Sequence, residues 1–154
     1  MQITVVAVGR ARMGPEALLF EQYKSRMQSP FSLQLKEVEE KRPIVRAERR
    51  KNEAILLKAC IADGAHLVAL DEQGKSFSSR NFATMIESLQ NQGVRDLVFI
   101  IGGAEGLDNT LKSQAHQTIS FGMQTWPHLL VRGMLAEQLY RAQCIIGGHP
   151  YHRE

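Results

Sequence analysis

The sequence predicts an α/β fold with a mostly parallel sheet, and three observations lead to this expectation. The 154 residues are 44% hydrophobic, enough to bury one core. Short apolar runs alternate with segments of helical periodicity along the whole chain. No linker, repeat or low-complexity tract divides it. Strands alternating with helices are typical of a parallel sheet covered by helices, and we expect one domain over residues 1–154.

The first half of the chain predicts two strand and helix units. The β-branched run 3–8 is typical of a buried parallel strand and stops at Gly9. A helix is expected over 15–27, with proline at its first position, where a missing N–H costs least. Imperfect alternation over 31–38 predicts a half-exposed edge strand. Helical spacing then resumes over 46–62, with Asp63-Gly64 as the expected C-cap.

The second half predicts strongly apolar strands. A strand that ends at Leu70 is followed by Asp71-Glu72 and an expected turn at Gln73-Gly74. The expected strands are 66–70, 97–101 and 118–121, and the expected helices are 79–92, 107–114 and 127–145.

The charge balance permits RNA binding without proving it. Nineteen Lys and Arg residues against 16 Asp and Glu leave a net charge of +3. A dedicated nucleic-acid binder often has a denser basic surface, so a basic face here must be local or assembled from more than one subunit. Basic residues cluster at 41–42 and within 46–51.

Cysteine usage and the N-terminus favour a reduced, cytoplasmic compartment. Cys60 and Cys144 have no metal-type spacing. The apolar stretch 3–8 is too short for a signal segment or a membrane span. No membrane association is therefore expected. His149 and His152 with Glu154 lack further ligands, so no metal site is expected either.

Three segments follow predicted strands and are expected to form a ligand site, because ligands of parallel sheets bind beyond the carboxyl ends of the strands. The first is the strand end at Leu70. The second is the turn 102–106, where Gly102 and Gly103 allow a positive φ and close approach of a ligand. A tight connection is the alternative for this turn. The GxGxxG spacing of dinucleotide sites is absent and Glu105 disfavours phosphate, so an uncharged nucleoside such as that of S-adenosylmethionine suits the turn better.

The third segment is 121–126, whose apolar side chains and open backbone groups could surround adenine. Core packing of these side chains is the commoner alternative. The residues of this segment that we take as candidate cofactor contacts are Phe121, Gly122, Met123, Gln124, Thr125 and Trp126.

The C-terminal stretch carries the remaining candidates. A solvated helix face and a disordered end are the alternatives. Aromatic, imidazole and guanidinium groups together nevertheless supply the stacking, hydrogen bonds and charge that single-stranded RNA recognition requires. The candidate residues are Arg132, Arg141, Tyr151, His152 and Arg153.

Five motifs in order span nearly the whole chain: ITVVAVG, LVALDEQGK, VFIIGGAEGL, ISFGMQTWPH and LVRGMLAEQLYRAQCIIGGHPYHRE. Through them the chain resembles the SPOUT methyltransferases, and specifically the 23S rRNA pseudouridine N3-methyltransferase family known as RlmH. The last motif is very specific, whereas a glycine turn alone would be weak.

The resemblance implies properties that no periodicity shows. It implies a C-terminal deep trefoil knot, a homodimer, and S-adenosylmethionine bound in the knot near the subunit interface by Leu70, Gly102 and 121–126. It implies methyl transfer to N3 of a pseudouridine in 23S rRNA, within the assembled ribosome. It also implies that 43–50 varies among members, so basic residues there carry little weight.

A mechanism follows as a hypothesis. N3 carries a proton, and His152 is the candidate acceptor because imidazole exchanges protons near neutral pH. Arg132, Arg141 and Arg153 could stabilise the anionic base or hold phosphates, and Tyr151 could stack on the flipped base. A non-catalytic ribosome-binding factor and a flavodoxin-like or nucleotide-binding protein are the alternatives.

Overall fold

A computed structural model describes residues 1–152, and it contains one five-stranded sheet in which every pair of neighbouring strands is parallel. The strand order is β2-β1-β4-β3-β5. The strands are β1 (Gln2–Val8), β2 (Ser32–Val38), β3 (His66–Ser76), β4 (Asp96–Ile101) and β5 (Gln117–Ser120). The α/β class and the edge position of β2 are therefore confirmed.

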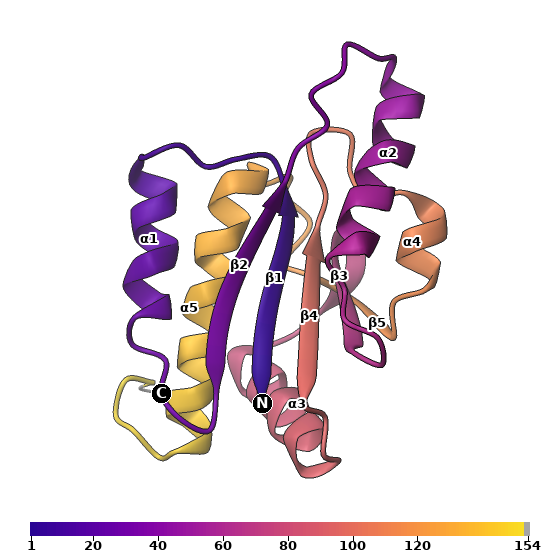
Figure 1. The fold of residues 1–154 in the computed structure, drawn as a ribbon. Helices are drawn as coiled ribbons and strands as arrows, with labels where there is room; N and C mark the ends of the chain where they lie inside the picture. Colours follow the sequence, from indigo (N-terminus) through magenta and orange to yellow (C-terminus); the bar gives the residue numbers. More distant parts are fainter. Residues whose placement is uncertain (153–154) are drawn as a thin grey trace.

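Helices cover both faces of the sheet (Figure 1). The helices are α1 (Pro15–Lys24), α2 (Arg46–Ala59), α3 (Ser79–Asn91), α4 (Asn109–Ser113) and α5 (His128–Ile146). One apolar core joins α1, α3 and α5 to the sheet around Phe20, Phe99 and Leu135. A second core joins α2 and α4 to the opposite face around Leu57 and Leu111. Side chains that alternate along β1 and β4 enter the two cores in turn, as the pleat of a strand requires.

The chain differs from the expected pattern most in β3. This strand does not end at Leu70, and Gln73-Gly74 is not a turn between elements. Both Leu70 and Lys75 oppose Ile119 of β5, so the residues between them bulge out of the ladder before pairing resumes. A Cβ on Gly74 would lie 2.5 Å from the backbone carbon of Ile119, so only glycine lets the bulge lie this close to β5.

The expected C-cap of α2 is also wrong. The helix ends at Ala59 with Cys60 as the cap, and Asp63-Gly64 lies in the turn that follows. The amide of Cys60 donates to the carbonyl of Leu57, which tightens the last turn before Gly64 is reached. The trefoil knot stays a prediction.

Candidate functional site

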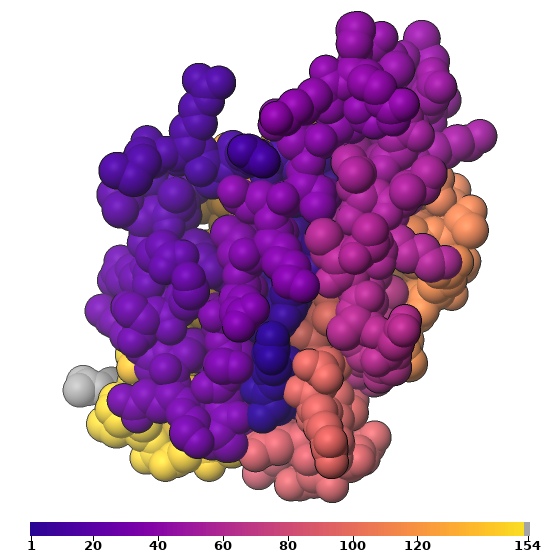
Figure 2. All heavy atoms as spheres, viewed as in Figure 1, coloured from indigo at the N-terminus to yellow at the C-terminus, as the bar shows by residue number. Residues whose placement is uncertain are grey.

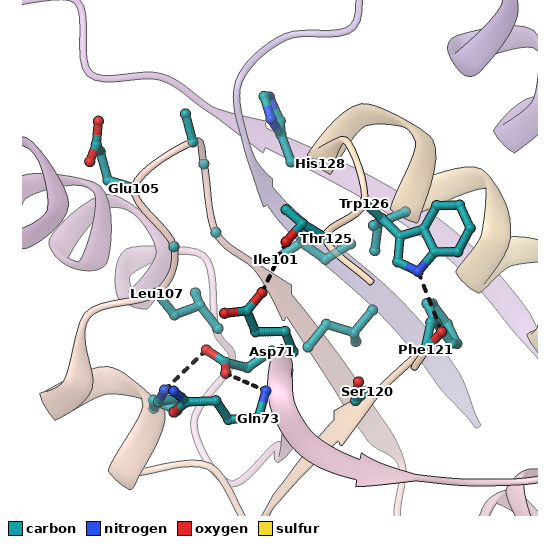
Figure 3. Close-up of a pocket in the computed structure, with 18 of the residues that line it drawn as sticks. Asp71, Gln73, Ile101, Glu105, Leu107, Ser120, Phe121, Thr125, Trp126 and His128 are labelled. Carbon is teal, nitrogen blue, oxygen red and sulfur yellow. Dashed lines mark hydrogen bonds and ion pairs between the residues drawn. The ribbon is translucent and has the colours of Figure 1, made fainter. Parts of the chain in front are cut away.

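The bulge of β3 and the carboxyl ends of β4 and β5 surround a cavity of about 800 Å³. This volume lies within the range of small-molecule sites. Leu70, Gly102 and the segment 121–126 all contribute to its walls, so the three segments singled out in the sequence meet in one place (Figure 3). Met123 is the exception, because its side chain is 97% exposed and does not line the cavity.

The glycine turn closes on itself at one side of the cavity. The amide of Gly106 donates to the carbonyl of Gly103 at 3.0 Å. A Cβ on Gly102 would lie 2.6 Å from the backbone carbon of Gly106. The expected positive φ is found at Gly106 (73°) and at neither Gly102 nor Gly103. Gly102 is therefore required because the backbone of Gly106 approaches it closely. The positive φ expected from the sequence is not the reason.

Glu105 belongs to the same turn but is not aimed into a phosphate site. Its carboxylate pairs with Arg46 of α2 at 3.3 Å. In Figure 3 it lies at the side of the cavity away from Trp126. The ion pair links the glycine turn to the helix that covers it.

The bulge of β3 brings polar groups that sequence reasoning did not include in the site. Asp71, Glu72 and Gln73 all line the cavity. Asp71 pairs with Lys112 at 3.0 Å, and the hydroxyl of Thr125 donates to Glu72 at 3.3 Å. The signal available in the sequence was the acidic pair directly after an apolar strand.

The segment after β5 forms the opposite wall. The hydroxyl of Ser120 donates to the carbonyl of Gly122, which has a φ of 112°, at 2.7 Å. The indole N–H of Trp126 donates to the carbonyl of Phe121 at 3.4 Å (Figure 3). These bonds hold a tight loop whose apolar faces and remaining backbone groups border the cavity.

The first turn of α5 completes the wall with His128 and Val131. Burial, and secondarily the charge of Arg132, lowers the pKa of His128 below its ordinary value, so its imidazole is neutral at neutral pH. A Cβ on Gly9 would lie 3.1 Å from Nε2 of His128, so Gly9 leaves the room that this side chain occupies.

Arg132 itself is a buried anchor. Its side chain is 1% exposed, and it donates to Glu37 Oε1 at 2.7 Å and to the carbonyls of Val8 and Gly9 at 2.6 and 2.8 Å. Burial lowers its pKa, an effect that Glu37 opposes. The expectation that Arg132 meets an RNA anion does not fit this position, because its terminal nitrogens are directed to the ends of β1 and β2.

Three of the C-terminal candidates cluster at the far end of α5. Arg141 bonds to Glu137 through its Nε at 2.9 Å and also through Nη2, and its Nη1 lies 3.3 Å from Nδ1 of His152. The hydroxyl of Tyr151 donates to Glu137 at 3.1 Å. Burial is the largest of several effects that raise the pKa of Tyr151, which keeps the hydroxyl protonated. We call Glu137, Arg141, Tyr151 and His152 the C-terminal cluster; Arg153 lies outside the described residues.

The C-terminal cluster does not reach the cavity of its own chain. None of its members lines that cavity. His128 lies at one end of α5, and Tyr151 and His152 follow the other end. A helix of 19 residues is about 28 Å long, so the two groups of candidates are separated by the length of α5.

The site is suited to S-adenosylmethionine. Apolar walls from Leu70, Ile119 and Phe121 match the faces of a nucleoside. The carboxylate of Glu72 gives the wall a negative charge that would favour a sulfonium, whereas the charge of Asp71 is balanced by Lys112. Among residues 1–152, no group of histidine, cysteine and acidic side chains is arranged to hold a metal ion, and no helix there is long and apolar enough to cross a membrane.

Comparison with known proteins supports this fold and shows the family. A family model described as "Predicted SPOUT methyltransferase" matches residues 1–152, and the chain belongs to this family. Two relatives named Ribosomal RNA large subunit methyltransferase H are 49% identical in Rhodospirillum centenum and 47% identical in Paramagnetospirillum magneticum, each over 99% of both chains. A probable methylase family protein from Haemophilus influenzae has the same fold, with a TM-score of 0.58 and 13% identity over 99% of this chain and 70% of that one.

Proposed function

We propose that the chain transfers a methyl group from S-adenosylmethionine to N3 of a pseudouridine in large-subunit ribosomal RNA, and that it does so as a cytoplasmic homodimer acting on the assembled ribosome. The observation that carries the proposal is the cavity between the bulge of β3 and the carboxyl ends of β4 and β5, in a chain of the SPOUT family. The names of the full-length relatives support the choice of ribosomal RNA.

The residues that would hold the cofactor are those at the cavity: Leu70, Gly102, Phe121, Gly122, Gln124, Thr125 and Trp126. The cofactor would supply a methyl group on a positively charged sulfur. Glu72 would favour that charge, and the apolar walls would exclude water. Positioning of the reacting groups should contribute most of the rate, because the transfer needs alignment more than charge stabilisation.

Removal of the N3 proton requires a base, and the expected base, His152, does not line the cavity of its own chain. His152 is the proposed acceptor, with Arg141 beside it to stabilise the anionic base and Tyr151 to contact it. Because α5 separates these residues from the cavity of their own chain, we propose that a second copy supplies them. Arg153 is proposed to act with them.

A complementation experiment tests this arrangement. His152→Ala keeps its cavity and loses the proton acceptor, whereas Thr125→Trp fills the cavity from an exposed position and keeps the acceptor. Each variant alone is expected to be inactive on ribosomes with labelled S-adenosylmethionine. Mixed dimers should recover activity at one of their two sites, because that site combines the intact cavity of the His152→Ala chain with the intact His152 of the Thr125→Trp chain.

The outcomes separate the alternatives. Inactive mixed dimers of folded variants would place cavity and tail in the same chain. A monomer by sedimentation would exclude the dimer. Mass spectrometry of ribosomal RNA from cells lacking the gene should show one pseudouridine without its methyl group. Failure of the purified protein to bind S-adenosylmethionine would favour a non-catalytic ribosome-binding factor.

A further inference from the structure

The helix α2 places a charged side chain at the cavity without an ionic partner. Arg50 lines the cavity and is partly buried, and its Nε is buried without a hydrogen-bond partner. It stands three and seven residues before Glu53 and Leu57, the two buried residues of α2, so it lies on the face of the helix that is turned to the sheet. An arginine on such a face is rarely left without a partner.

The neighbouring arginines of α2 have evident structural roles. Arg46 pairs with Glu105 at 3.3 Å. Arg49 donates to the carbonyls of Glu40 and Arg42 at 3.2 and 3.4 Å. Arg50 makes no hydrogen bond or ion pair with any residue in the described part of the chain. It therefore contributes little to the attachment of α2, unlike the two arginines beside it.

The other basic residues that line the cavity carry no unpaired positive charge. Lys112 is neutralised by Asp71. His128 is neutral, because burial lowers its pKa. Glu105 is paired with Arg46. Among residues 1–152 that line the cavity, Arg50 is thus the only positive charge with no carboxylate bound to it.

We propose that Arg50 is the oxyanion-binding residue of the cavity and donates to a carboxylate or phosphate oxygen of a bound ligand. A guanidinium binds either group through two parallel hydrogen bonds. Two sources can supply the oxyanion: the amino-acid carboxylate of S-adenosylmethionine, or a backbone phosphate of the RNA beside the target base. This inference rests on the proposed function, because both ligands belong to that reaction.

The position of α2 suits either source. Its N-terminal part and the segment before it stand out from the body of the molecule (Figure 2). Arg50 therefore comes from an element that borders the cavity and also faces outward. The variability of 43–50 implied by the family resemblance made these basic residues uninformative from sequence, and the buried, unpartnered Nε is what distinguishes Arg50 from the others.

The test compares Arg50→Gln with Lys51→Gln, which removes the same charge from the adjacent, exposed position outside the cavity. Calorimetry measures binding of S-adenosylmethionine, S-adenosylhomocysteine and methylthioadenosine, of which the last lacks the carboxylate. If Arg50 holds the carboxylate, Arg50→Gln weakens the first two by about tenfold or more and leaves methylthioadenosine unchanged.

If Arg50 holds a phosphate, all three nucleosides bind normally to Arg50→Gln. The KM for ribosomes then rises about tenfold, and binding of ribosomes depends less steeply on salt than in the parent protein. Arg50→Lys keeps the charge without the bidentate geometry and should recover only part of either effect. Thermal unfolding checks that the variants are folded.

Two results would overturn the proposal: unchanged nucleoside affinities together with an unchanged KM, or an equal effect of Lys51→Gln. Failure of the proposed function is distinguishable, because the parent protein itself would then bind neither S-adenosylmethionine nor S-adenosylhomocysteine.

Discussion

The two ends of α5 differ in burial and in what they can do. At its N-terminal end, His128 borders the cavity and Arg132, 1% exposed, is fixed by three acceptors from β1, β2 and the residue after β1. At its C-terminal end, Arg141, Tyr151 and His152 are only partly buried and border no cofactor cavity. The N-terminal end of α5 thus forms part of the cavity wall, and the C-terminal end carries the candidate reactive groups at the surface. Under the proposed function a complete site would need both ends, and within one chain they lie a helix length apart.

The largest expected effect is on turnover. His152→Ala should lower turnover by about 10² to 10⁴-fold, the usual contribution of a general base. Binding of S-adenosylmethionine should be unchanged by calorimetry, because His152 lies outside the cavity. The matched control is His149→Ala, which removes an imidazole three residues earlier in the tail. The ring of His149 accepts a hydrogen bond from the amide of Tyr151 but is not a proposed proton acceptor, so this variant should keep most of its activity. Normal turnover of His152→Ala would remove this residue from the mechanism.

Two arginine variants compare the ends of α5 directly in stability. Arg132→Met removes the buried cation that pairs with Glu37 and donates to two carbonyls, while Glu37 keeps the Ala11 amide as a donor. This change should lower the free energy of unfolding by about 3 kcal/mol. Arg141→Met removes a partly exposed pair with Glu137 and should cost under about 1 kcal/mol. Urea denaturation measures both. Equal losses would contradict the distinction between a buried anchor and a surface cluster.

The cavity end is also expected to be sensitive at Gly102. Gly102→Ala brings a Cβ within 2.6 Å of the Gly106 backbone and should open the turn, which would weaken cofactor binding about tenfold. Gly64→Ala is the control, because nothing lies within 4 Å of the added atom; its φ of 75° strains alanine, which the φ of Gly102 does not. Calorimetry should show normal cofactor affinity for Gly64→Ala. Normal affinity of Gly102→Ala would show that the turn does not shape the site.

The smallest expected effect depends on pH. Glu53 lies under the glycine turn, 7% exposed, and burial raises the pKa of its carboxyl above 4.5 despite the nearby charge of Arg49. A folded pKa above the unfolded one means that the folded state binds the proton more tightly, so stability is lost as pH rises from about 4.5 through the raised value. Glu53→Gln should remove this slope. Melting temperatures of both proteins across that pH window measure it, and parallel curves would refute a titrating Glu53.

The sequence allowed much of the fold to be predicted, because apolar periodicity reports which residues are buried. The succession of strands and helices along the chain and the edge position of β2 followed from it. The meeting of Leu70, Gly102 and most of 121–126 followed from the position of ligand sites in parallel sheets. The end of β3 could not be predicted in this way. Pairing with β5 stops after Leu70 and resumes at Lys75, and a bulge between parallel strands has no local signature in the sequence. The role of Gly102 was also misjudged, since a requirement set by the backbone of Gly106 is not visible from the glycine itself.

By itself the sequence determined the α/β class, the family and which side chains are candidates for the chemistry, since these depend on residue types and their order. Only the tertiary structure decided which of those side chains share a space. It buried Arg132, left Met123 exposed, brought Arg50 to the cavity from a helix that looked uninformative, and set the C-terminal cluster one helix length away. The physical reason is that proximity between residues far apart in sequence is set by how the helices pack on the sheet, and no local pattern encodes that packing.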